Sequence, residues 1–327
     1  TGDNISYSTI DNLVMVGNLS LSANGMYFTN SSDLTLTNNT ISVGGEYGIN
    51  SYDSDNSVVN NNIITGQYNT TIEMRNCDNC DFEGNTLLGN TVLQLRDSDN
   101  LDIHNNQVLD HAYGFLLYNC DSAQITSNEM IKPTSSMFGP YLYRLIYNVN
   151  SSSALIQDNV FSVEDGNIMS ANYWESVGLI SAYQSEIRGN TYTLTSGLLE
   201  DYLGDGWFIR ANESIITDNT YFINGLGNNS GFGYRGFIIT EGTEYNRSLV
   251  ENNTYVVSSH FPNYAYDSST AGQIILNGYT DFTNNTIDVD ISTNYMYTEG
   301  NPSGIILSRG EDNTISDNSI INSQNTS

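Results

Sequence analysis

The motif Asn38-Asn39-Thr40-Ile41 returns as Asn284-Asn285-Thr286-Ile287 near the other end of the chain. Between the two copies, an asparagine followed two residues later by an apolar residue recurs at regular steps. The asparagines of this series are Asn39, Asn62, Asn85, Asn106, Asn128, Asn159, Asn190, Asn219, Asn253, Asn285 and Asn318. Self-similarity at a fixed period is the sequence signature of a repeat protein, in which each unit stacks on the next. The series of asparagines therefore predicts a repeat protein.

The positions around each asparagine repeat as well. The preceding residue is always Asn, Gly, Ser or Asp, and these types tolerate a positive φ angle in a turn. The residue three positions before the asparagine is always apolar, as in Leu36, Val59 and Phe82. Each unit contains about three short β-segments separated by turns, and no segment has a helical period.

Units of this kind can bury their apolar side only by stacking on one another. Parallel stacking at a strand spacing of about 4.8 Å turns the apolar columns into a core and the asparagines into a ladder of side-chain hydrogen bonds. We therefore predict an all-β fold, a parallel β-helix (β-solenoid) of about twelve coils forming a single domain over residues 1–327. Asn18 is a candidate twelfth member of the ladder. The chain begins and stops inside a coil without a capping repeat, so we expect it to be part of a longer protein, or its ends to abut other subunits.

The period changes along the chain. The steps are 21 to 23 residues from Asn39 to Asn128 and 29 to 34 residues from Asn128 to Asn318. We expect short regular coils over residues 1–131 and coils with long stacked loop insertions over residues 132–327. The extra residues always fall between the apolar residue after the asparagine and the next strand. The loops should therefore emerge along one edge of the rod, and such insertions often form the binding face of a solenoid.

These insertions are rich in aromatic residues, with acidic residues between them. We call the predicted aromatic and acidic surface the loop wall, and its candidate ligand-binding residues are Tyr173, Trp174, Tyr202, Trp207, Tyr234, Tyr264, Tyr266 and Tyr295. Aromatic rings suit sugars and protein interfaces equally. Two interpretations stay open: the rings pack together to hold the loops, or they bind surface glycans or neighbouring subunits.

The charge restricts the possible partners. The chain carries 37 acidic and nine basic residues, a formal net charge of −28. Such a field repels nucleic acid and anionic membrane surfaces. No apolar run approaches the roughly 18 residues of a membrane span, so we expect no membrane insertion in this segment. Metal cations, Ca²⁺ above all, and neutral sugars remain possible partners.

Calcium and glycans have specific candidate positions. Carboxylates on successive turns are hard ligands for Ca²⁺, and Asp97, Asp99 and Asp102 are the example we select. No EF-hand loop or glycine-rich nonapeptide accompanies them. Glycosylation sequons on the repeat turn place candidate glycans at Asn38, Asn252 and Asn284.

Cysteine and histidine are rare. Cys77 and Cys120 share a column two coils apart, which is too far for a disulfide. A local Cys77–Cys80 bridge is one possibility, and small buried thiols in a column of serines are the other. His104, His111 and His260 are scattered, so we expect them exposed or packed against loops, with no transition-metal cluster and no catalytic triad.

The repeated Asn-Asn-Thr-Ile motif resembles the right-handed parallel β-helix proteins with NosD-type repeats and the adhesin-like surface proteins of archaea. The resemblance covers nearly the whole chain and implies a right-handed helix; the strict six-residue period of a left-handed helix is missing. It implies little about activity, because β-helices host lyases, hydrolases, tailspikes and inert stalks. The scattered histidines argue against the copper handling that the NosD name suggests.

We expect a non-catalytic extracellular protein of the cell surface, a stalk, adhesin or envelope-lattice component that binds glycans or neighbouring subunits through the loop wall. The alternative is a polysaccharide lyase or glycoside hydrolase, because glycoside hydrolysis needs two carboxylates across a sugar. Its candidate carboxylates are Glu164, Asp165, Glu200, Asp201, Asp205, Asp288 and Asp290. A tailspike-like trimer is a third possibility.

Overall fold

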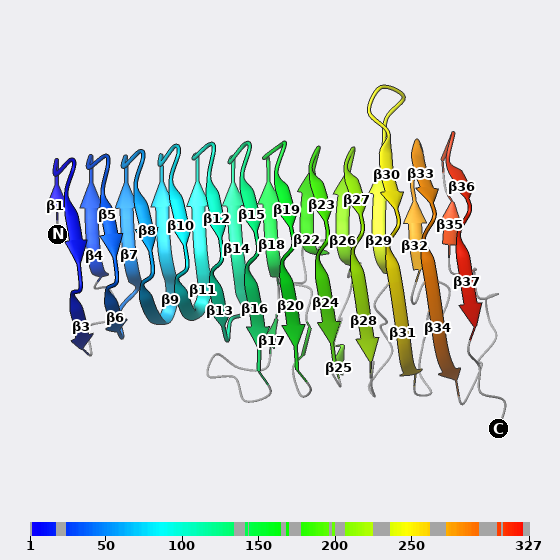
Figure 1. The fold of residues 1–327 in the computed structure, drawn as a ribbon, viewed down its shortest axis with the longest axis horizontal. Helices are drawn as coiled ribbons and strands as arrows, with labels where there is room; N and C mark the ends of the chain where they lie inside the picture. Colours follow the sequence, from blue (N-terminus) through cyan, green and yellow to red (C-terminus); the bar gives the residue numbers. More distant parts are fainter. Residues whose placement is uncertain are drawn as a thin grey trace.

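The computed structural model describes residues 2–17, 24–133, 141–142, 144–164, 168–169, 178–195, 198–199, 207–224, 236–261, 273–293, 306–308 and 310–322. In these ranges the chain forms strands and turns, and no helix occurs. The coils follow one another along the long axis of the molecule, with the two termini at opposite ends (Figure 1). No helix that could cross a membrane occurs among the described residues.

Each coil contributes one strand to each of three parallel rows, which we number in chain order. Row 1 consists of β1 (Gly2–Asp3), β4 (Asn24–Thr29), β7 (Tyr47–Tyr52), the end of β9 (Ile63–Arg75), the end of β11 (Thr86–Arg96), β14 (Tyr113–Tyr118), β18 (Arg144–Val149), β22 (Gly178–Tyr183), β26 (Trp207–Asn212), β29 (Gly236–Glu241), β32 (Gln273–Leu276) and β35 (Ile306–Ser308).

Row 2 is a separate sheet of very short strands. They are β2 (Thr9–Asp11), β5 (Thr35–Thr37), β8 (Val58–Asn60), β10 (Asp81–Glu83), β12 (Asp102–His104), β15 (Gln124–Thr126), β19 (Leu155–Gln157), β23 (Glu186–Arg188), β27 (Ile215–Thr217), β30 (Ser248–Glu251), β33 (Thr280–Thr283) and β36 (Thr314–Ser316).

Row 3 follows the ladder asparagine in each coil. It consists of β3 (Val14–Gly17), β6 (Thr40–Val43), the starts of β9 and β11, β13 (Gln107–Leu109), β16 (Glu129–Lys132), β20 (Val160–Val163), β24 (Thr191–Leu194), β28 (Thr220–Asn224), β31 (Thr254–Phe261), β34 (Thr286–Thr293) and β37 (Ser319–Asn322). Rows 1 and 3 belong to one sheet, because β9 and β11 run continuously from row 3 into row 1 of the next coil. All strand pairs are parallel, which confirms the predicted parallel β-helix.

The apolar column of row 2 forms one wall of the core. Its residues are buried from Leu36 to Phe282, with relative exposures of 0 to 1%, whereas Ile10 in the first coil is only partly buried. Ile315, in the last coil, is 46% exposed because no described coil covers it. Rows 1 and 3 supply the other walls, for example with Ile49 and Ile64.

The recurrent asparagines form a continuous ladder. Ten side-chain bonds of 2.9 to 3.1 Å join Asn39 to Asn318, each from one Nδ2 to the Oδ1 of the next coil. The same amides also bond to the backbone: Asn62 Nδ2 donates to the Leu36 carbonyl at 2.8 Å, and Asn62 Oδ1 accepts the Asn39 N–H at 2.9 Å. The residue before each ladder asparagine has a positive φ, as its type predicts.

The first coil does not continue the ladder as expected. Row 3 pairs Val14 with Thr40, so Leu13 lies opposite Asn39, and the Leu13 N–H donates to Asn39 Oδ1 at 2.9 Å. Asn18 lies outside the described residues, but this register assigns the ladder position to Leu13. The interpretation of Asn18 as a twelfth member is therefore wrong.

The insertions are only partly described. Three two-residue strands, β17 (Tyr141–Leu142), β21 (Ile168–Met169) and β25 (Leu198–Leu199), come from consecutive insertions and pair in parallel. One extension lies elsewhere, contrary to expectation. Residues 242–247 lengthen the turn between rows 1 and 2, and their loop rises above the others at the top of Figure 1.

Candidate functional site

The outward face of row 1 is set by an irregularity in its strands. β11 pairs Thr91 with Tyr113 and Leu93 with Phe115, while the residue between, Val92, has no partner in the register. Val92 and Leu93 are both fully buried. From Leu93 onward the side chains alternate between the two faces of the strand. Gln94 and Arg96, the fourth and sixth residues counted from Thr91, therefore point outward.

Tyrosine and arginine side chains line this face on consecutive coils. Tyr52, Arg75, Arg96 and Tyr118 lie in one register position of row 1. The Arg75 guanidinium carbon is 5.3 Å from the Tyr52 ring centroid, and that of Arg96 is 4.6 Å from the Tyr118 centroid. Further rings flank this register position on the coils at both ends, each two residues earlier in its strand, with centroid distances of 6.0 Å for Tyr27–Tyr52 and 5.8 Å for Tyr118–Tyr147. We call these six half-buried residues the Tyr–Arg stack: Tyr27, Tyr52, Arg75, Arg96, Tyr118 and Tyr147.

Both arginines are held in the same way, by the residue two positions earlier. Glu73 Oε1 accepts hydrogen bonds from Arg75 Nη2 and, at 2.8 Å, from Arg75 Nε. With its amide oxygen toward Arg96, Gln94 accepts bonds of 2.8 Å from Arg96 Nε and Nη2. Each guanidinium therefore keeps both Nη1 hydrogens and one Nη2 hydrogen for other partners.

The two holders differ in charge. The Glu73 carboxylate compensates Arg75, and its hydrogen bond raises the pKa of Arg75. Gln94 is neutral, and Arg96 makes no ion pair within the described ranges. Arg75, Arg96 and Glu73 together carry one net positive charge.

Buried polar side chains lie beside the arginines, in the register position of Gln94. Glu73 is fully buried, and its Oε2 has no hydrogen-bond partner among the described residues. Asn50, opposite it on the preceding coil, is 4% exposed, and its Oδ1 has no partner there either. Burial and the Glu73 carboxylate raise the pKa of Tyr47. Glu73 is thus a buried carboxylate that holds Arg75 through Oε1.

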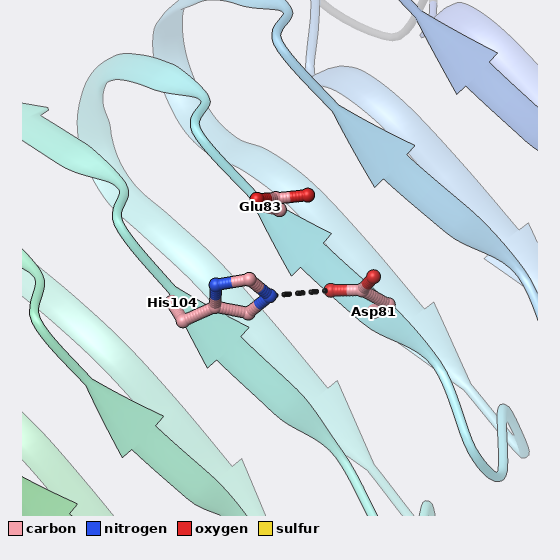
Figure 2. A group of neighbouring side chains, drawn as sticks. All are labelled: Asp81, Glu83 and His104. Carbon is pink, nitrogen blue, oxygen red and sulfur yellow. Dashed lines mark ion pairs between the residues drawn. The ribbon is translucent and has the colours of Figure 1, made fainter.

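A second group lies on row 2 and combines Asp81 and Glu83 of β10 with His104 of β12 (Figure 2). His104 Nε2 is 3.2 Å from Asp81 Oδ1, and its Nδ1 lies 2.9 Å from the Asn105 amide nitrogen. Asn105 donates to Nδ1, so the tautomer that satisfies both contacts carries its hydrogen on Nε2. Burial raises the pKa of Asp81, and His104 opposes that shift. One ligand atom from each residue lies within 4.8 Å of the others.

The predicted calcium residues do not form such a group. Asp97 Oδ1 accepts a bond of 2.7 Å from Asn119 Nδ2, and Asp99 Oδ1 accepts the Asp121 N–H at 2.9 Å. Asp102 lies on row 2, opposite Asp81. Among the described residues, the grouping of three ligand atoms occurs at Asp81, Glu83 and His104 instead. Glu83 and His104 both lie two residues before a ladder asparagine. Alignment of the repeats therefore places them on adjacent coils, and this would have indicated the group from the sequence.

The loop wall lies almost entirely outside the described residues. This applies to Tyr173, Trp174, Tyr202, Tyr234, Tyr264, Tyr266 and Tyr295, and to the carboxylates Asp165, Glu200, Asp201 and Asp205. Trp207 begins β26 in row 1, opposite Gly178 and Gly236. Glu164 is exposed after β20, and Asp288 and Asp290 lie in β34. The loop wall stays a prediction.

The remaining predicted positions are described more fully. Cys77 and Cys80 form a disulfide, which selects the local bridge over the free thiols. Cys120 is free and buried, and burial raises the pKa of its thiol to about 11. Of the two positions expected for His111, exposed or packed against loops, its full burial excludes the exposed one.

The three candidate glycosylation sites lie on exposed turns. Asn38, Asn252 and Asn284 are exposed, with φ angles of 55°, 56° and 55°. Their side chains are therefore accessible, and the glycans themselves stay a prediction.

The three parallel rows and the ladder define a right-handed parallel β-helix protein. A family model described as "Periplasmic copper-binding protein (NosD)" matches residues 2–197, and the chain belongs to this family. The comparison with curated proteins gives no match.

Among solved structures, the chain is similar to the DFA-IIIase from Arthrobacter chlorophenolicus A6 in complex with GF2. The identity is 13% and the TM-score 0.51, over 87% of this chain and 65% of that chain. A mutant of the same enzyme gives 14% identity and a TM-score of 0.52, over 99% of this chain and 70% of that chain. The chain thus spans about two thirds of these relatives, and the likeness is one of fold.

The family name raises the question of copper. Cu(I) favours thiolate and thioether ligands, but Cys77 and Cys80 are joined in a disulfide and Cys120 is a single buried thiol. The His104 group supplies one imidazole and two carboxylates, without a second imidazole. The described cysteines and the His104 group therefore supply neither a pair of free thiols nor a pair of imidazoles for copper.

Proposed function

We propose that this protein is an exported, non-catalytic carbohydrate-binding β-helix that holds glycans on the Tyr–Arg stack. The observation that carries the proposal is that Tyr52, Arg75, Arg96 and Tyr118 share one register position on four successive coils. At about 4.8 Å per coil, this row spans about 14 Å, which suits a short oligosaccharide. Tyrosine rings supply apolar surface with a polar rim, and guanidinium groups supply fixed hydrogen-bond donors for sugar oxygens.

The comparisons support this reading. The DFA-IIIase structures with the same fold contain bound GF2 and DFA-III, so such a helix can present a ligand-binding face. The periplasmic description of the family agrees with export. Attachment to the cell surface, and a contribution of the loop wall to adhesion or subunit contacts, are part of this proposal.

The stack itself favours binding over cleavage. Glycoside hydrolysis needs two carboxylates across the scissile bond. Glu73, a carboxylate in contact with the stack, is fully buried and bonded to Arg75. A hydrolase or lyase would therefore have to use other carboxylates, such as those of the loop wall.

Calorimetry with a panel of neutral and acidic oligosaccharides tests the proposal. We expect binding that falls at least tenfold in Tyr52→Ala and Tyr118→Ala. Tyr245→Ala is the matched control, because Tyr245 is 89% exposed and lies in the loop of residues 242–247. Equal loss in the control, or no binding of any sugar, would contradict the proposal. Chromatography of the incubated sugars detects cleavage products, and their appearance would favour the lyase or hydrolase alternative.

A further inference from the structure

We infer that the Tyr–Arg stack is selective for acidic sugars and binds one carboxylate between Arg75 and Arg96. The inference rests on the proposed function and specifies its ligand. It starts from the scarcity of cations: the chain has nine basic residues against 37 acidic ones. Two of the nine occupy the same position on adjacent coils. Like charges directly opposite each other destabilise a sheet, so this placement has a cost that an anionic ligand would offset.

The charge balance at the pair differs from that at three other cations with described ion pairs. Lys132 pairs with Asp110 at 3.0 Å, Arg188 with Glu186 at 2.8 Å and Arg247 with Asp281 at 2.6 Å. Arg75 pairs with Glu73. Among the described residues, the partners of Arg96 are the Tyr118 ring and the neutral amide of Gln94. An uncompensated arginine in a chain of net charge −28 indicates a missing anion.

The geometry of the pair suits a carboxylate. Glu73 and Gln94 take the same Nε and Nη2 edge of their arginines, so both guanidinium groups keep the same N–H donors free. The backbones of the two arginines are paired on adjacent coils, about 4.8 Å apart. One carboxylate between them can accept charge-assisted bonds from both, and these bonds are stronger than neutral ones. The pair, with Glu73, then becomes neutral.

The flanking rings point to a sugar acid in place of a small free anion. Tyr52 and Tyr118 border the arginine pair on either side, and Tyr27 and Tyr147 extend the aromatic surface. A uronic acid combines a carboxylate with a ring that has apolar and hydroxyl-bearing parts, and it can use both components of the stack. Inorganic phosphate can use only the arginines.

The test compares trigalacturonate with the same trisaccharide after reduction of its carboxyl groups to alcohols. We expect at least tenfold tighter binding of the acidic form in calorimetry. Gln94→Glu should abolish this preference, because it gives Arg96 the compensating carboxylate that Arg75 already has. Arg96→Gln should abolish it as well. Arg188→Gln, which removes an arginine from row 2, should leave it unchanged. Circular dichroism and thermal unfolding establish that each variant is folded.

The outcomes separate the inference from the proposed function. Equal affinity for the acidic and reduced trisaccharides overturns the selectivity and leaves carbohydrate binding intact. Binding of neither sugar, and of no other glycan, overturns both. The role of the arginine pair is contradicted if Gln94→Glu keeps the preference for the acidic trisaccharide. It is also contradicted if Arg188→Gln removes that preference as fully as Arg96→Gln does. Displacement of trigalacturonate by an equal concentration of inorganic phosphate would show a general anion site and overturn the choice of a sugar acid.

Discussion

Arg75 and Arg96 occupy the same position on adjacent coils, and each is held through Nε and Nη2 by the side chain two residues before it. The holder is a carboxylate in one coil, Glu73, and the amide Gln94 in the next. The same local geometry therefore gives a compensated arginine beside an uncompensated one. The repeat places Glu73 and Gln94 in the same register position, so both hold their arginine in the same way. The change from a carboxylate to an amide at this position leaves the charge of Arg96 uncompensated on the outer face of row 1.

The asparagine ladder should dominate the stability of the regular coils. Asn128→Ala removes the acceptor of two bonds from Asn106, at 2.9 and 3.0 Å, and both donors are buried. It also removes the donors to Asn159 Oδ1 and to the Ile103 carbonyl. Each buried group left unsatisfied costs about 1–3 kcal/mol, so we expect a loss of about 3–5 kcal/mol in the free energy of unfolding. Urea titration followed by circular dichroism measures it.

Asn318→Ala is the matched control. Asn318 ends the ladder and is only partly buried, so its loss should cost about 1 kcal/mol. Equal effects of the two substitutions would show that the ladder does not act through burial of its hydrogen bonds.

The sequence could predict the rows, the turns and the ladder because these features repeat in every coil. The Asn column and the apolar column keep one residue type or one property, which makes them visible without a structure. The Tyr–Arg stack keeps neither. Its residues Tyr52, Arg75, Arg96 and Tyr118 each lie ten positions before a ladder asparagine, so their shared column was present in the sequence. Their outward direction depends on the unpaired residue in row 1, which no residue type signals.

Four aromatic rings of row 3 stack in the core, and three of them are tyrosines whose buried hydroxyl groups have no hydrogen-bond partner among the described residues. Phe161, Tyr192, Tyr221 and Tyr255 stack with centroid distances of 4.7 to 4.8 Å. Tyr221 is fully buried, and its hydroxyl has no hydrogen-bond partner among the described residues. Burial of such a hydroxyl costs about 1–3 kcal/mol. We therefore expect Tyr221→Phe to raise the free energy of unfolding by about 1 kcal/mol, measured by urea titration.

Tyr221→Leu separates the ring from its hydroxyl. It removes the stacking along with the hydroxyl and leaves a cavity, so it should destabilise the protein by about 2–3 kcal/mol. If Tyr221→Phe is itself destabilising, the hydroxyl is hydrogen-bonded, for example to a buried water.

The Cys77–Cys80 disulfide should contribute little to stability, because it closes a loop with a sequence separation of only three residues. The entropy of closing so short a loop corresponds to about 2 kcal/mol. Cys77→Ser with Cys80→Ser should therefore lower the thermal midpoint by only a few degrees. Serine is also the residue of neighbouring coils in these columns, at Ser54 and Ser57.

Reduction provides a second measurement of the same quantity. Treatment of the wild-type chain with dithiothreitol should give the same shift as the double substitution. Loss of the cooperative transition on reduction would contradict the prediction, and Cys120→Ser controls for the free thiol.

His111 should make the stability depend on pH. It is fully buried beside the Lys132–Asp110 ion pair, and neither ring nitrogen has a hydrogen-bond partner among the described residues. Burial, and then the Lys132 charge, lower its pKa from 6.5 to about 3, while Asp110 acts in the opposite direction. The unfolded chain therefore binds a proton at His111 below about pH 6.5, where the folded chain does not.

This difference in proton binding makes the free energy of unfolding fall as the pH falls. Above pH 6.5 the imidazole is neutral in both states and contributes no pH dependence. As the pH falls from 6.5 towards 3, stability is lost progressively, at up to about 1.4 kcal/mol per pH unit. His111→Phe removes the group, so its stability should fall less steeply than that of the wild type between pH 6.5 and pH 4 in urea titrations. Carboxylates protonate in both proteins and cancel in the comparison, so parallel curves over this range would show that His111 is protonated in the folded state or is accessible to water.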